Sequence, residues 1–307
     1  MLGKRSEVHT TVVPEGVTKI GIEAFASCNG LTSVTLPNSL LYLQWGAFRN
    51  CSSLNDVTLP DSLETIGQEV FCNCTALNSL TLPKSLLKLG ARTFDGCSRL
   101  TSLTLLASLE HIGANTFSGC TALTCITLPD SLVSLGCSAF QNCTSLKSLA
   151  LPKALQTIEH QTFHNCTALT CITLPASLVS LGRSAFQNCI SLKSLALPKA
   201  LQTIEQQAFH NCSGLTSITF PASLVSVGAE AFAGCSGLAS LNFPDSLETI
   251  KQECFRDCSG LTSVILPDTW WLHLGRRAFA FCSALDTSTS VVLRTPVSRS
   301  VIDFTFA

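Results

Sequence analysis

The sequence has few charged residues: Asp, Glu, Lys and Arg make up 13% of its 307 residues, about half the share of an ordinary soluble domain. The formal net charge of −1 provides no basic field to attract nucleic acid or anionic lipid. There is no apolar run long enough for a membrane-spanning helix. The residues up to Gly16 also lack the apolar core of a secretory signal, so we expect none.

Patterns typical of catalysis are also missing. No Cys-x-x-Cys pair occurs, although the chain has 17 cysteines, and metal sites usually draw on such pairs. Ser, His and carboxylate residues do not recur in an arrangement that suggests a catalytic triad. The sequence therefore predicts no metal site, no cofactor and no enzymatic activity.

What the sequence does contain is a repeat. The motif Phe-x-x-Cys-x-x-Leu begins at Phe25 and recurs every 23 residues up to Phe255, with a twelfth copy one residue late at Phe279. Proline keeps the same period from Pro14 to Pro267, except at Leu106. A period held over so many copies indicates a repeat architecture, in which each unit covers the apolar face of its neighbour.

One unit, residues 31–53, shows how the period arises. Val34 and Leu36 alternate with polar residues, as in a half-buried strand, and Pro37 ends that strand because it has no N–H to donate. Leu40 and Leu43 begin a second inward-facing segment, and Phe48 fills the middle of the coil. We predict a right-handed solenoid of about twelve 23-residue coils, with a parallel β-sheet face and little helix, whose strands stack about 4.8 Å apart.

The consensus, with its Leu-Pro strand end and its Ala-Phe-x-x-Cys turn, resembles the 23-residue leucine-rich-repeat class of the BspA-like, treponemal-type proteins. The resemblance covers about residues 8–285. It implies bacterial or protozoan adhesion proteins that bind host or bacterial partners, and it implies an exported or cell-surface location. It supplies no catalytic residues. The location stays open, because unpaired cysteines suit a reducing compartment.

The repeat divides the chain into three parts. Residues 1–13 are expected to form an N-terminal capping strand, residues 14–285 the repeat array, and residues 286–307 an irregular C-terminal cap, which could include a hairpin. Within the array, residues 120–165 and 166–211 differ at only five positions. Coils copied in this way are suited to presenting a surface rather than to building one unique catalytic site.

Two repeated residue types invite a chemical interpretation. The twelve motif cysteines could form a metal or redox ladder, but their spacing favours a column of buried thiols that act as small hydrophobes. Five Asn-x-Ser/Thr triplets match glycosylation acceptors. Their fixed place beside the cysteine favours a role in the turn.

The outward strand positions are small, neutral and rich in hydroxyl groups. They form either a ladder that keeps the sheet soluble or a shallow groove that a partner can approach closely. The candidate binding residues in this row are Ser33, Thr35, Ser79, Thr81, Ser102, Thr104, Cys125 and Thr127.

The C-terminal end provides the aromatic residues outside the repeat pattern, Trp270, Trp271, Phe304 and Phe306. Aromatic side chains are enriched in interface cores, so these are further candidate binding residues. The sequence thus predicts a non-enzymatic protein for protein–protein interaction, including adhesion. The partner is a protein of unknown identity or a second copy of the chain. The alternative is a module that binds a small apolar ligand in a C-terminal hydrophobic cleft.

Overall fold

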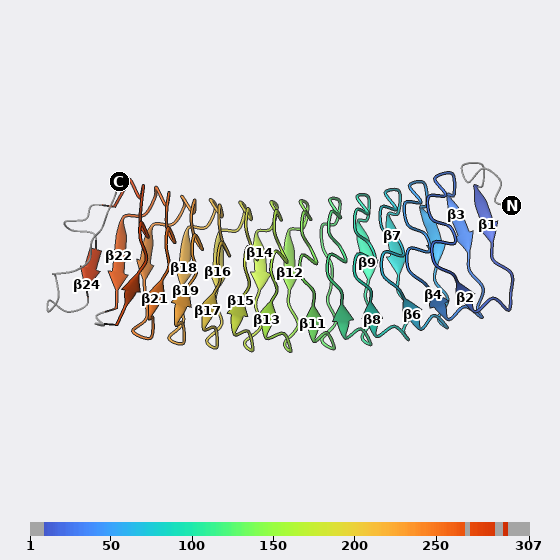
Figure 1. The fold of residues 1–307 in the computed structure, drawn as a ribbon, viewed down its shortest axis with the longest axis horizontal. Coiled ribbons are helices and arrows are strands. Elements are labelled where there is room, and N and C mark those ends of the chain that lie inside the picture. Colours follow the sequence, from blue (N-terminus) through green and yellow to red (C-terminus); the bar gives the residue numbers. More distant parts are fainter. Residues whose placement is uncertain (1–8, 268–270, 286–290, 294–307) are drawn as a thin grey trace. The chain divides into compact units, whose positions relative to one another are not determined.

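The computed structural model describes residues 9–267, 271–285 and 291–293, and these residues contain strands and turns but no helix. The chain falls into two compact units, residues 1–154 and 155–307. Each unit is a parallel β-solenoid, which confirms the predicted fold class (Figure 1). Most turns of the solenoid carry one strand of three or four residues, which we call a face strand, and one strand of two residues, which we call a side strand.

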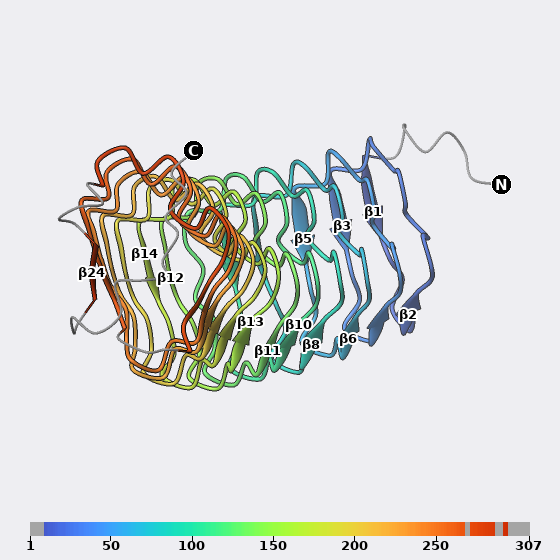
Figure 2. The ribbon, with the colours of Figure 1, turned by 60° about the vertical axis from the view of Figure 1, so that its left-hand side comes forward.

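Unit 1 contains six strands of each kind among its described residues. Its face strands are β1 (Thr10–Val12), β3 (Ser33–Thr35), β5 (Asp56–Thr58), β7 (Ser79–Thr81), β9 (Ser102–Thr104) and β12 (Ser148–Ala150). Its side strands are β2 (Lys19–Ile20), β4 (Tyr42–Leu43), β6 (Thr65–Ile66), β8 (Lys88–Leu89), β10 (His111–Ile112) and β11 (Ser134–Leu135). The two kinds of strand run along different walls of the unit (Figure 2).

Unit 2 repeats this arrangement. Its face strands are β14 (Cys171–Thr173), β16 (Ser194–Ala196), β18 (Ser217–Thr219), β20 (Ser240–Asn242), β22 (Ser263–Leu266) and β24 (Val291–Leu293). Its side strands are β13 (Thr157–Ile158), β15 (Ser180–Leu181), β17 (Thr203–Ile204), β19 (Ser226–Val227), β21 (Thr249–Ile250) and β23 (His273–Leu274).

The strand register follows the repeat. Ser79 pairs with Ser102 and Ser194 with Ser217, so equivalent residues of successive coils lie side by side. The extra residue before the last motif copy is absorbed between β21 and β23, where Thr249 pairs with His273. β24 pairs in parallel with β22, so residues 291–293 add a strand to the last regular coil. The hairpin considered for the C-terminal cap would include residues after 293, which lie outside the described residues, so it stays a prediction.

The two walls differ in continuity. The side strands form a six-stranded sheet in each unit, whereas the face strands form short separate sheets. In unit 1, β1, β3 and β5 form one sheet and β7 and β9 another, while in unit 2 β18 and β20 belong to different sheets. Among the described residues, β5 therefore pairs with β3 but not with β7, and an interruption of the same kind separates β18 from β20.

The core is a column of phenylalanine rings. The motif phenylalanines from Phe48 to Phe255 are fully buried. Within each unit, neighbouring rings stack with centroids 5.0–5.8 Å apart. This agrees with the predicted central position of the motif phenylalanine, because one ring per coil keeps the stack continuous.

Side chains also connect successive coils by hydrogen bonds to buried carbonyl groups. The thiol of Cys74 donates to the carbonyl of Phe48 over 3.2 Å, and the hydroxyl of Ser85 donates to the carbonyl of Leu63 over 2.6 Å. The same two bonds recur along the chain, at 3.0–3.3 Å for the thiols and 2.6–3.0 Å for the hydroxyls. A carbonyl oxygen has two lone pairs, so each can accept this bond in addition to a backbone one.

The turn around each phenylalanine requires two left-handed residues, one two places before the ring and one two places after it. In one coil these are Glu69 and Asn73, both with φ of 57°. Asn tolerates this conformation better than most residues, and Asn73 also donates to the Asn50 side chain over 3.0 Å. The turn role predicted for the Asn-x-Ser/Thr triplets is thereby confirmed.

Replacement of a core ring should destabilise the protein strongly. We expect Phe140→Ala to lower the free energy of unfolding by about 3–5 kcal/mol, because it leaves a cavity in a fully buried stack. Thermal or denaturant unfolding, with the exposed Lys147→Ala as control, measures this difference. A loss no larger than that of the control would contradict the role of the ring.

Candidate functional site

The outward side chains of the face strands form one surface in each unit, which we call the strand face. Along β7 and β9 the serine and threonine side chains are exposed while Leu80 and Leu103 between them are buried. The alternation follows from the strand period of two, which sends successive side chains to opposite sides of the sheet. The surface of the sheet is therefore made of small polar side chains, and the side chains that point the other way are packed in the apolar core.

The predicted site residues of unit 1 lie on this face. Ser79, Thr81, Ser102 and Thr104 are exposed on β7 and β9, and on β3 Thr35 is exposed and Ser33 partly buried. The expectation for Cys125 and Thr127 needs a correction. Both side chains are exposed, but residues 124–128 form no strand, because this segment lacks the ladder hydrogen bonds to the neighbouring face strands.

The strand face of unit 1 carries a shallow hollow of about 720 Å³, which we call the β5–β9 hollow. It lies over the interruption between β5 and β7 and reaches β9, and it contains four of the predicted residues. Its polar side chains are Asn55, Asp56, Thr58, Asp61, Asn78, Ser79, Thr81, Ser102 and Thr104. A second hollow of about 580 Å³ shares Asn55 and is lined by hydroxyl groups and Arg99.

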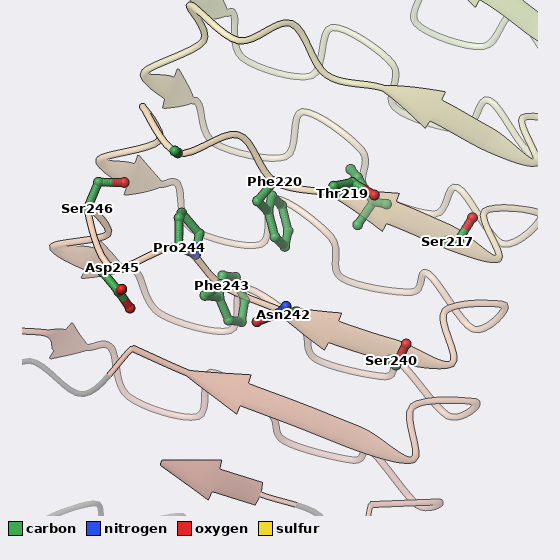
Figure 3. A pocket seen from close by; sticks show the side chains of 11 residues that line it. Ser217, Thr219, Phe220, Ser240, Asn242, Phe243, Pro244, Asp245 and Ser246 are labelled. Atoms are coloured by element: carbon green, nitrogen blue, oxygen red, sulfur yellow. The ribbon is translucent and has the colours of Figure 1, made fainter. Parts of the chain in front are cut away.

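Unit 2 has a hollow of about 610 Å³ at one of its interruptions, between β18 and β20 (Figure 3). Ser217, Thr219, Ser240 and Asn242 line one part of it, and Asp245 lines the end beyond β20. The hollow is thus another depression of the strand face, lined by polar and apolar residues alike.

Two unusual phenylalanines border this hollow of unit 2. Phe220 and Phe243 take the place of the leucine that ends the strand in most coils, and their rings stack 4.8 Å apart (Figure 3). Both are buried, at 7% and 0% exposure, so they offer a ligand little apolar surface. The Phe-Pro pairs that replace Leu-Pro were a sequence signal for this site that the sequence analysis missed.

The motif cysteines are buried thiols that bond to the core backbone, as described above. Burial raises the pKa of the Cys51 and Cys212 thiols to about 12. These groups stay protonated at neutral pH, and protonated thiols are poor nucleophiles and poor metal ligands. Among the described residues, no three His, Cys, Asp or Glu side chains are placed to hold a metal ion. The geometry supports the buried-column interpretation, with the thiol acting as a hydrogen-bond donor as well as a small hydrophobe.

Comparison with known families matches the model of the BspA type leucine rich repeat region over residues 4–124, 87–216 and 179–292. The chain belongs to the BspA-type leucine-rich-repeat family. The resemblance noted in the sequence is thereby confirmed. Repeats of this family typically mediate protein–protein interaction or adhesion, and such proteins are generally non-enzymatic binding scaffolds.

Solved structures of similar proteins agree with this assignment. A leucine-rich repeat protein from Bacteroides ovatus is 26% identical, with a TM-score of 0.64, and the match covers 94% of this chain and 92% of that one. A leucine rich cell surface protein from Faecalibacterium prausnitzii is 25% identical, with a TM-score of 0.56 and coverage of 95% and 80%. The pneumococcal vaccine antigen PcpA, 20% identical with a TM-score of 0.62 and coverage of 95% and 82%, shares the fold. No curated protein matches the sequence significantly.

Of the four C-terminal candidate residues in this BspA-type chain, the structure describes only Trp271. Trp270, Phe304 and Phe306 lie outside the described residues. Trp271 is 49% exposed and lines none of the three hollows above, so its place in a binding site stays a prediction. The described residues contain no helix that is long and apolar enough to cross a membrane.

An aromatic residue that the sequence analysis did not select lies near this end. Phe281 occupies the left-handed turn position with φ of 59°, where most coils have Asn or Gly, and its side chain is half exposed. The guanidinium groups of Arg256 and Arg277 lie 5.8 and 5.3 Å from its ring centroid. A bulky residue rarely adopts this conformation, and the two cation–π contacts help to hold it there.

Thiol chemistry can test the buried column. In native protein we expect a thiol reagent to label Cys125 and Cys171 quickly, because they are the exposed cysteines of the described chain, and Cys137 more slowly. In denaturant, most of the 17 cysteines should titrate as thiols. The double variant Cys125→Ser/Cys171→Ser should lose the rapid labelling by the thiol reagent and keep the slower labelling of Cys137. Recovery of most cysteines as disulfides would point instead to an oxidised extracellular scaffold.

Proposed function

We propose that this protein is a non-enzymatic interaction protein that presents its strand face to a protein partner, with adhesion to host or bacterial partners as its role. One observation carries the proposal. Most face strands expose small neutral side chains over a buried core, and this surface is hollowed in both units.

The physical properties of the strand face suit contact with a folded protein. Ser and Thr side chains are short, so a partner can approach the sheet closely and replace hydration by direct hydrogen bonds. Because the base below them is packed and fixed by stacked coils, little conformational entropy is lost on binding. The face carries few charges, which makes its contacts depend on shape and hydrogen bonding more than on long-range attraction.

The similar proteins provide further support. The Faecalibacterium protein is named as a cell surface protein, and this chain is similar to it over 95% of its length. We therefore extend a cell-surface location to this chain as part of the proposal. The apolar-ligand alternative gains no support from the hollow in unit 2, since its two aromatic lining residues, Phe220 and Phe243, are buried.

Bulky charged substitutions on the strand face should weaken partner capture. We expect Thr81→Arg or Thr219→Arg to reduce several-fold the amount of partner protein recovered from host or bacterial extracts, because each large cation would keep the partner from the sheet. Thr65→Arg and Ser134→Arg, at exposed positions of side strands, are matched controls. Quantitative pull-down measures the effect, and thermal melting verifies that each variant folds. Equal capture by the face variants and the controls would refute the proposal.

A further inference from the structure

The β5–β9 hollow is the part of the strand face with a distinct chemistry. β5 pairs with β3, and β7 pairs with β9, but β5 and β7 do not pair with each other. Val57 and Leu80 have buried side chains, so it is their backbone that borders the hollow. Backbone donors and acceptors that no neighbouring strand uses therefore lie beside the exposed hydroxyl groups.

The charged side chains that line the hollow are both acidic. Asp56 is the only charged residue at the outward positions of the described face strands, and Asp61 lies beyond the end of the same strand. Both residues are exposed, and neither carboxylate makes an ion pair or a hydrogen bond to another described side chain. No Lys, Arg or His lines the hollow. It therefore attracts a cation with hydrogen-bonding capacity and disfavours phosphate or carboxylate ligands.

Strand geometry sets the spacing of these two charges. Asp61 is five positions after Asp56, so the two residues are at most about 16 Å apart along the strand direction. In an extended peptide, residues i and i+4 point to the same side and lie about 13 Å apart. Two basic side chains with that spacing can reach both carboxylates, since Lys and Arg side chains are long and flexible. The three residues of the bound peptide between its two basic residues would then place their backbone over the hydroxyl and amide groups of the hollow.

From these observations we propose that the β5–β9 hollow binds an extended, basic segment of a polypeptide partner. Asp56 and Asp61 pair with two Lys or Arg side chains four positions apart, and the Ser, Thr and Asn side chains of the hollow hydrogen-bond the intervening backbone. This assignment rests on the proposed function, because it specifies which chemistry the strand face recognises in its protein partner.

Short labelled peptides provide the test. The probe is acetyl-Arg-Ser-Thr-Ser-Arg-amide, compared with peptides that carry Gln or Glu in place of both Arg and with a peptide of the same composition whose two Arg are adjacent. Fluorescence titration of the full chain at low salt should show the spaced Arg peptide binding most tightly. Its affinity should decrease as the salt concentration rises, because these charges are exposed.

Variants of the chain assign the binding to the hollow. Asp56→Asn/Asp61→Asn should weaken binding of the spaced Arg peptide about tenfold or more, because charge-assisted hydrogen bonds are lost. Asp130→Asn is the matched control, since Asp130 follows Pro129 as Asp61 follows Pro60 but does not line the hollow. Unchanged melting curves are expected for all variants, because these carboxylates are exposed.

Several results would overturn the assignment: equal binding of the Gln or Glu peptide, equal binding of the peptide with adjacent Arg, an equal loss with Asp130→Asn, or equally tight binding of a simple polyamine. Such a failure is distinguishable from failure of the proposed function. Thr219 lies on the strand face but outside the β5–β9 hollow, so the effect of Thr219→Arg on capture of a partner protein tests the strand face independently.

Discussion

Each unit depends on one constraint, which is that equivalent residues of successive coils must lie directly beside one another. The phenylalanine stack imposes it from the core, because a displaced ring would leave a void beside its neighbours. The thiol and hydroxyl bonds to carbonyl groups of the preceding coil impose it from the polar side. Buried carbonyl and thiol groups are costly when unsatisfied, so a coil with another period would lose both kinds of interaction. The single insertion in the array occurs before the last motif copy, where β23 still pairs with β21.

The same constraint decides which residues can vary. Inward positions and turn positions are used in every coil, whereas the outward side chains of the face strands point away from the core. Asp56 and Asn242 replace the usual Ser, Thr or Ala in this row without disturbing the core. At residues 220 and 243 even a core position changes from Leu to Phe, and the two rings accommodate each other by stacking. Specific recognition can therefore arise through a few substitutions on a uniform scaffold.

The repeat made much of the fold predictable. Period, strand position, buried phenylalanines, buried cysteines and the Asn turn each follow from residue types that recur at one spacing. The interruptions of the face-strand ladder were not predictable, because β5 and β7 have the same alternation of exposed and buried side chains as the paired strands. The thiol bonds to Phe carbonyls were missed because cysteine was treated as a hydrophobe. Phe281 was missed because its left-handed conformation is a property of the turn and not of the residue.

The low charge of the chain gives its few exposed ionic groups a larger role. In a protein with many mixed charges, two unpaired carboxylates would be neutralised by nearby lysines and arginines. Here Arg49 and Arg92 both pair with Glu69 at the turn edge. The strand face keeps its acidic groups, with no cation among the lining residues of the hollow. A neutral ladder of hydroxyl groups discriminates poorly between partners, because every polypeptide backbone can satisfy it. Two fixed carboxylates add a requirement for charge and spacing that the ladder lacks, which is how a repetitive surface can become selective while its coils remain interchangeable.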